Sequence, residues 1–176
     1  EWLVRDQGAI VRQLGLDPKK YAHNLIQDEG GIDKCAVPFN LDTLNDVPAD
    51  GIYIAPNISK ENTGIRYAEI LKQIFNNESN AIEKNYDRAI QQEQPGGFIG
   101  HGREEISTFW NTFISAFPDS KFTVEHISYT EEKDQAKKAA IRWSLVGNHS
   151  GNGNFGNPSN TPVYVMGISH AEFGPR

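Results

Sequence analysis

The sequence has little cysteine and no long apolar run. Cys35 is the single cysteine among 176 residues, so a disulfide framework of the secreted kind is excluded. No apolar run approaches the roughly 18 to 20 residues that a membrane-spanning helix needs. The first residues are acidic where a signal peptide would be basic and then apolar. We therefore predict a cytoplasmic protein with no membrane partner.

Positive charge is also scarce. The chain carries 17 Lys and Arg against 23 Asp and Glu, a formal net charge of −6. Binding to a polyanion depends on clustered Lys and Arg side chains, and the two densest basic stretches, residues 17–23 and 134–143, are short and have acids nearby. The composition predicts no nucleic-acid partner.

Three common kinds of functional motif are missing or out of context. No two of the five histidines are at metal-ligand spacing, and there is neither a C-x-x-C nor a G-x-S-x-G motif. Residues 151–156, GNGNFG, match G-x-G-x-x-G, but the following NPSNTP will not open the helix that binds a pyrophosphate. We predict no metal and no nucleotide cofactor, and a loop between two strands at this position.

Hydrophobic periodicity predicts helices first and strands after them. Apolar residues recur at helical spacing over residues 65–77, 80–92 and 103–117, and Pro118 follows the third segment. Residues 121–130, 137–149 and 161–173 are rich in β-branched and aromatic residues. Alternation places Phe122, Val124 and His126 on one face of the first strand, and Trp143 and His149 on one face of the second. This order predicts an α+β fold with an antiparallel sheet.

The N-terminal third has a different character. Residues 1–5 suit a strand, Asp6 suits a helix N-cap, Gln7 to Leu14 suit a short helix and Gly15 suits its C-terminal stop. Residues 16–63 are rich in Pro, Gly, Asp and Asn and predict a linker or wrapping arm, with one short helix near residues 19–27.

Large aromatic side chains and histidines are the candidates for a binding site. Trp143 and His149 share a predicted strand face, and an aromatic wall with a polar group at its mouth is typical of a small-molecule pocket. Aromatic residues at helical spacing, such as Phe109 and Phe113, are more often plain core. His126, His149 and His170 lie on three predicted strands, so two of them could converge if those strands are neighbours.

Residues 98–128 and 139–173 resemble the SnoaL-like polyketide cyclase family of the nuclear transport factor 2-like superfamily. The matching pattern begins with a helix that ends in residues 117–119 (Phe-Pro-Asp). A strand with Arg142-Trp143 follows, and after it come Gly147, His149 and Gly151. The pattern continues with a loop that contains Gly156 and Pro158, and it ends in a strand with Gly167-Ile168. The resemblance covers about residues 64–173.

This resemblance implies a cone-shaped barrel, in which three helices pack on a strongly curved antiparallel sheet around an apolar cavity. It also implies homodimers joined through sheet surfaces, and a cyclase chemistry that needs no cofactor and no metal. An acid/base group moves a proton next to a carbonyl in such a reaction. The family's strand-end histidine corresponds to His149.

One departure from the family pattern bears on the reaction. The acid/base aspartate of the cyclases lies in the region that corresponds to residues 161–170, where this chain has no Asp or Glu. Either another group, such as His170 or Glu172, substitutes, or the protein is no aldol cyclase. His149 is the acid/base candidate, with His170 or Asp6 in a supporting role. Under the resemblance, the substrate-binding candidates are Trp110, Trp143, Tyr86, Tyr164 and Trp2.

Residues 1–15 resemble the C-terminal strand and helix of the same family, through Glu1, Trp2 and Asp6. Residues 64–176 form the predicted SnoaL-like domain, which stops where such a strand would begin. A fragment of a tandem two-domain protein or a circular permutant would explain this order. In either case, residues 1–5 are predicted to complete the sheet, in their own chain or by swapping into a neighbour.

Two functional hypotheses follow from the sequence. The first is a protein that binds an apolar small molecule and carries out cofactor-independent cyclase or isomerase chemistry, with His149 as acid/base. The alternative is a non-catalytic small-molecule-binding or protein-interaction module of the same fold.

Overall fold

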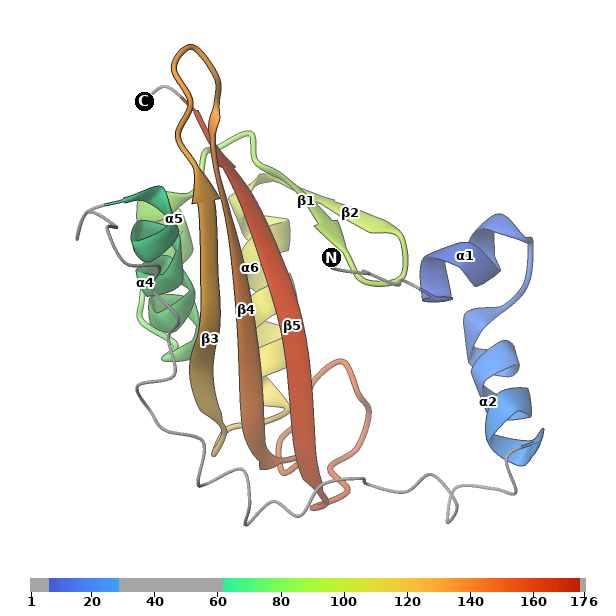
Figure 1. Cartoon of the computed structure of the whole chain (residues 1–176). Coiled ribbons are helices and arrows are strands. Elements are labelled where there is room, and N and C mark those ends of the chain that lie inside the picture. The colour runs from blue at the N-terminus through green and yellow to red at the C-terminus, as the bar shows by residue number, and fades with distance from the viewer. Residues whose placement is uncertain (1–6, 29–61, 175–176) are drawn as a thin grey trace.

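The computed structural model describes residues 7–28 and 62–174 (Figure 1). Two short helices come first, and three helices and five strands follow. The helices are α1 (Gln7–Gln13), α2 (Pro18–Asp28), α4 (Thr63–Phe75), α5 (Ala81–Asn85) and α6 (Gly102–Ser115), and the strands are β1 (Gln91–Gln94), β2 (Phe98–His101), β3 (Lys121–Thr130), β4 (Lys137–Asn148) and β5 (Pro162–Phe173).

The three long strands form one antiparallel sheet in the order β3-β4-β5, as the sequence predicts. Trp143 of β4 lies opposite Val124 of β3 and Gly167 of β5, and Ile141 lies opposite Ser169. Within the described ranges, no strand pairs with the other edge of β5.

Helices α4, α5 and α6 cover the inner face of this sheet. Helix α4 begins at Asn62, whose side chain accepts a hydrogen bond from the backbone N–H of Ile65, as an N-cap does. Phe75 of α4 and Phe113 of α6 both contact the indole of Trp143, so the two helices share one core. The most deeply buried large side chains of this core are Leu71, Ile106, Ile141 and Leu145.

A β-bulge in β3 changes the predicted face of His126. The register shifts between Val124 and His126, so that His126 pairs with Arg142 and shares the outer face of the sheet with it. Glu125 is the extra residue, and strict alternation cannot anticipate it. The prediction that His126 faces the same way as Val124 was therefore wrong.

The predicted helix over residues 80–92 is also wrong beyond its first turns. Helix α5 ends at Tyr86, which is extended, and the Asp87 carboxylate accepts a hydrogen bond from the N–H of Ala89 in a turn. Residues 91–94 and 98–101 instead form the β1–β2 hairpin. Gly96 and Gly97 close it with φ of +88° and +75°, a conformation that favours glycine. The hairpin pairing outweighs the helical spacing of the preceding apolar residues.

The glycine-rich loop after β4 lies against the C-terminal end of α6. The N–H of Gly151 donates to the carbonyl oxygen of Ala116 at 3.2 Å. A Cβ on Gly151 would lie 1.9 Å from the Ser115 carbonyl oxygen, and one on Gly153 would lie 2.2 Å from that of Thr112. The first two glycines of the G-x-G-x-x-G match therefore allow close backbone packing. The prediction of a loop between two strands is confirmed.

The N-terminal helices agree with the sequence. Helix α1 ends at Gln13 and is followed by Gly15, whose φ is +73°. The N–H groups of Gly15 and Leu16 donate to the carbonyls of Arg12 and Val11 in a Schellman motif. The Arg12 guanidinium lies over the ring of Phe98 at 4.3 Å, so α1 contacts the hairpin. Helix α2 confirms the short helix expected near residues 19–27.

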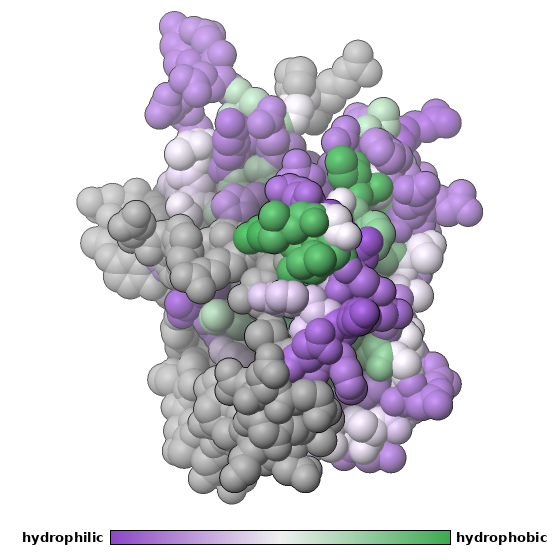
Figure 2. All heavy atoms as spheres, turned by 90° about the vertical axis from the view of Figure 1, so that its right-hand side faces the viewer, coloured by the Kyte–Doolittle hydropathy of each residue, from purple (hydrophilic) through white to green (hydrophobic). Residues whose placement is uncertain are grey.

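The side of the molecule that carries α1 and the hairpin displays an apolar patch among hydrophilic side chains (Figure 2). Large apolar side chains are exposed on both elements, namely Ile10, Leu14, Leu16, Phe98 and Ile99. The predicted strand over residues 1–5, the cap Asp6 and residues 29–61 of the predicted arm lie outside the described residues. Completion of the β5 edge by residues 1–5 stays a prediction.

The loop packing makes a prediction about stability. We expect Gly151→Ala and Gly153→Ala each to lower the free energy of unfolding by about 1–3 kcal/mol, because the new methyl group collides with a helix carbonyl. Urea titration followed by circular dichroism measures this. Gly174→Ala is the control, since nothing lies within 4 Å of its Cβ position. Equal stability of all three variants would contradict the packing role.

Candidate functional site

The interior between the helices and the sheet is filled with aromatic rings. Phe75 lies at its centre, stacked on Phe122 at 4.1 Å between ring centroids. The rings of Trp143 and Trp110 lie 5.0 and 5.3 Å from that of Phe75. Trp110 and Trp143, two of the predicted substrate-binding residues, are thus brought together and are buried.

Trp143 lies directly on the backbone of the neighbouring strand at Gly167. A Cβ on Gly167 would come within 2.2 Å of the indole ring, so only glycine allows this approach. In this position, the indole N–H of Trp143 donates to the Ser169 hydroxyl at 3.0 Å.

Ser169 belongs to a buried polar group that we call the hydroxyl cluster: the hydroxyls of Tyr67, Tyr86 and Ser169, and the indole N–H of Trp143. The Tyr67 hydroxyl has the side chains of Ser169 and Tyr86 as hydrogen-bond partners. It also donates a long bond of 3.4 Å to the backbone carbonyl of His170. The cluster joins α4, β4, β5 and the residue that follows α5.

Burial keeps both phenols of the cluster protonated. Desolvation raises the pKa of Tyr86 from 10.0 to about 12, although its side-chain hydrogen bond with Tyr67 opposes this. Desolvation, followed by the nearby Tyr86, raises the pKa of Tyr67 well above its ordinary value. At neutral pH the two side chains are therefore hydrogen-bond donors in an apolar interior.

Arg103 fixes the backbone that carries Tyr86. Its Nε donates to the Tyr86 carbonyl oxygen at 2.7 Å, and its Nη1 lies 2.8 Å from a carboxylate oxygen of Glu83. Helix α6 thus holds the end of α5.

His149 lies at the other end of the aromatic core. Its side chain is 8% exposed and sits near the rings of Phe117 and Phe155, at 5.8 and 6.3 Å between centroids. Its Nδ1 is 3.2 Å from the hydroxyl oxygen of Ser159. Its Nε2 is buried, with no hydrogen-bond partner in the described part of the chain.

Trp110 presents a second unpartnered group. Its indole Nε1 is buried and has no acceptor among the residues that the structure describes. An unpaired buried N–H costs about 1–3 kcal/mol, so groups of this kind call for an explanation.

Two of the predicted site residues lie on the outer face of the sheet. Alternation along β5 directs Val163, Gly167 and Ser169 inward and leaves Tyr164 and His170 outward. The Tyr164 hydroxyl lies 3.5 Å from a carboxylate oxygen of Glu125, which also pairs with Arg142 at 2.7 Å. Burial, followed by the charge of Glu125, raises the pKa of Tyr164.

The strand geometry therefore separates His170 and Tyr164 from the interior side chains with which the sequence had grouped them. Trp2 and Asp6 fall outside the described residues. The sequence did not single out Tyr67 and Ser169, which the structure places beside Tyr86 and Trp143. Their helical and strand spacing marks them as inward-facing, but nothing in it indicates that hydroxyls from distant segments meet.

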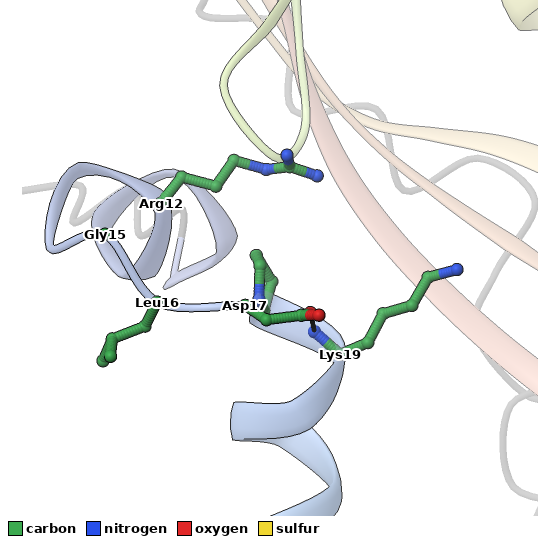
Figure 3. Close-up of a pocket in the computed structure, with 6 residues that line it drawn as sticks. Arg12, Gly15, Leu16, Asp17 and Lys19 are labelled. Atoms are coloured by element: carbon green, nitrogen blue, oxygen red, sulfur yellow. Dashed lines mark hydrogen bonds between the residues drawn. The ribbon is translucent and has the colours of Figure 1, made fainter.

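A hollow of about 610 Å³ lies away from this interior, where α1 meets α2 (Figure 3). The Asp17 carboxylate accepts a hydrogen bond from the backbone N–H of Lys19 at 2.8 Å and so caps α2. Arg12 extends toward the hairpin. Because its lining is exposed and its charged groups already serve these contacts, we do not assign this hollow as the functional site.

Two features are absent from the part of the chain that the structure describes. No helix within residues 7–28 or 62–174 is long and apolar enough to cross a bilayer. In the same ranges, no three His, Cys, Asp or Glu side chains form a group that could hold a metal ion.

The raised pKa of Tyr86 predicts a loss of stability in alkali. The folded pKa exceeds the unfolded value near 10, so the contribution is fully present below pH 10 and is lost as the pH rises toward 12. Urea midpoints at pH 9 and 11.5 should therefore differ less in Tyr86→Phe than in the unaltered protein. Tyr21→Phe, which removes an exposed hydroxyl, should behave as the unaltered protein does. An equal alkaline loss in Tyr86→Phe contradicts the assignment.

Comparison with solved structures places this geometry in a known fold. A crystal structure described as a SnoaL-like polyketide cyclase from Jannaschia sp. CCS1 superposes with a TM-score of 0.53 at 15% identity, over 67% of this chain and 83% of the other. A protein named "Rd1NTF2_04 with long sheet" superposes with a TM-score of 0.43 at 13% identity, over 62% of this chain and 88% of the other. No curated protein matches the sequence.

The family comparison is more direct. The sequence pattern of the SnoaL-like domain matches residues 69–174, which include α6, the long sheet and most of α4. The Jannaschia structure shows the same α+β fold. The chain belongs to the SnoaL-like domain family.

Proposed function

We propose that the interior beside Trp110 and β5 binds an apolar small molecule. The observation that carries the proposal is the indole N–H of Trp110, which is buried among aromatic rings with no acceptor in the described part of the chain. The face of an aromatic ligand accepts a weak hydrogen bond from such an N–H and would offset part of its desolvation cost. An aromatic lining with few polar groups is typical of small-molecule sites.

The uneven burial of β4 and β5 supports a ligand site in the same region. The inner side chains of β4 are almost fully buried, and Ile141 and Leu145 are 0% and 1% exposed. Every inner residue of β5 from Val163 to Phe173 is only partly buried. A ligand bound along β5 would cover the inner side chains that this strand leaves partly exposed. The similar Jannaschia protein is described as a polyketide cyclase, a name that also fits an apolar substrate.

Two hydrocarbons, tetralin and fluorene, test the binding proposal by native mass spectrometry and by thermal unfolding. We expect at least one to bind one to one and to raise the melting temperature, as a ligand of the native state does. Ala171→Phe and Glu172→Phe add the same ring to opposite faces of β5. Ala171→Phe, on the inner face, should weaken binding at least tenfold, while Glu172→Phe should leave it unchanged.

Failure of both hydrocarbons to bind contradicts the proposal. So does equal binding by the two phenylalanine variants, provided that circular dichroism shows both to be folded.

We further propose that the ligand undergoes cofactor-independent acid–base chemistry of the isomerase or cyclase type, with His149 moving the proton. The supporting observation is the buried Nε2 of His149, which has no partner in the described ranges while Nδ1 is held by Ser159. An imidazole held by one nitrogen can exchange a proton at the other.

Hydrogen–deuterium exchange at the carbon next to the carbonyl of 1-tetralone, followed by NMR in D₂O, tests this chemistry. We expect His149→Gln to slow the protein-dependent exchange at least a hundredfold, the lower range for a general acid or base. His101→Gln, an exposed histidine before α6, is the matched control. Exchange that is no faster than in buffer would favour the non-catalytic binding module, and exchange unaffected by His149→Gln would exclude His149 as the base.

Three narrower expectations remain predictions: the cytoplasmic location, the homodimer, and the supporting role of Asp6. The outer face of the sheet has exposed apolar residues that support a contact with a second copy, since Met166 is 60% and Ile168 is 36% exposed.

A further inference from the structure

The Nδ1 side of His149 is joined to two hydroxyls at the end of the glycine-rich loop, which we call the Ser159–Thr161 pair. Nδ1 is 3.2 Å from the Ser159 hydroxyl oxygen, and that oxygen is 2.6 Å from the hydroxyl oxygen of Thr161. Both hydroxyl residues are exposed, whereas the imidazole is buried. The ring thus contacts the surface through Nδ1, and its Nε2 lies on the buried side.

The backbone holds this pair beside the imidazole. The His149 N–H donates to the Thr161 carbonyl oxygen, and the Asn160 N–H donates to the His149 carbonyl oxygen, both at 2.9 Å. Asn160 has a φ of +55°, a left-handed conformation that Asn adopts more readily than most residues. The preceding residue, Asn148, is fixed in turn by the Asp119 carboxylate, which accepts from its backbone N–H and its side-chain amide. The distance from ring to hydroxyl is therefore set by the loop itself.

The two bonds of the Ser159 oxygen are coupled, because a hydroxyl carries a single proton. If Ser159 donates to Thr161, its oxygen accepts from an N–H at Nδ1, and Nε2 of the neutral His149 ring carries a lone pair. If Ser159 instead donates to Nδ1, the ring proton must be on Nε2.

The burial of Nε2 decides between these two arrangements. An N–H at Nε2 would be buried with no acceptor in the described part of the chain. Orphaned buried N–H groups are rarer in proteins than buried acceptors without a donor. The arrangement with the ring proton on Nδ1 of His149 is therefore favoured.

We propose that the Ser159–Thr161 pair fixes the tautomer of His149, with the proton on Nδ1 and the lone pair of Nε2 on the buried side. This inference rests on the proposed acid–base chemistry of His149. It names the direction in which that chemistry begins, since an unprotonated Nε2 accepts a proton before it can donate one. Ser159 and Thr161 are positioning residues, because they act through the imidazole.

Nitrogen NMR of the protein labelled with ¹⁵N-histidine measures the tautomer with no ligand present. Protonated and unprotonated ring nitrogens differ widely in chemical shift, and the His149 signals are assigned through contacts with the Phe117 and Phe155 rings. At about pH 8.5, where ordinary imidazoles are uncharged, we expect a protonated Nδ1 and an unprotonated Nε2. The exposed His101 is the internal control and should carry its proton mainly on Nε2, as a free histidine does in water.

Three hydroxyl variants test the cause of this tautomer. Ser159→Ala removes the acceptor for Nδ1, and Thr161→Val frees the Ser159 proton to donate to Nδ1, so both should shift the ring proton toward Nε2. Ser159→Thr keeps a hydroxyl and should keep the tautomer. Ser150→Ala is the matched control, because Ser150 is an exposed serine of the same loop whose hydroxyl lies 3.5 Å from the Asn148 carbonyl oxygen.

The same variants make a prediction for proton exchange in 1-tetralone. Ser159→Ala should slow the protein-dependent exchange roughly tenfold, because less of His149 then carries a free lone pair at Nε2. Ser159→Thr and Ser150→Ala should exchange at the rate of the unaltered protein.

The outcomes separate this inference from the proposed chemistry. An unprotonated Nδ1 of His149 in the unaltered protein overturns the inference, and this measurement needs no variant to fold. A tautomer that is unchanged in folded Ser159→Ala also overturns it. A protonated Nδ1 together with exchange no faster than in buffer contradicts the acid–base proposal and leaves the tautomer assignment standing.

Discussion

The organisation of the interior depends on one close contact, the Trp143 indole lying on the backbone of Gly167. A glycine at this point of β5 lets the large ring approach the strand, and no side chain could stand in its place. The contact brings the indole N–H to Ser169, and the same ring lies 5.0 Å from that of Phe75. The polar and the aromatic halves of the core are thus aligned by the same residue.

The two ends of this core differ in chemistry. At one end, the hydroxyls of Tyr67 and Tyr86 are surrounded by apolar side chains and stay protonated far above neutral pH. At the other end, the glycine-rich loop packs on α6 and encloses His149 beside Phe155.

The sequence predicted the fold well because its signals are local and strong. Strand composition gave β3, β4 and β5, and the apolar stripe with Pro118 behind it gave α6. It failed where tertiary pairing outweighs periodicity, as in the β1–β2 hairpin, and where the bulge at Glu125 inverts alternation. Trp110, Trp143 and Tyr86 were found as aromatic candidates. Tyr67 and Ser169 were not, because a hydroxyl network joins residues 67, 86 and 169 only after the chain folds.

The central claim is that the interior beside Trp110 receives an apolar molecule. Its most direct measurement is the ¹⁵N–¹H resonance of the Trp110 indole N–H, assigned by its loss in Trp110→Phe, while fluorene is added to the labelled protein. An aromatic ring bound beside this N–H changes its chemical shift, so the account predicts a shift that saturates as the site fills. A Trp110 resonance that does not move at any concentration of fluorene contradicts it.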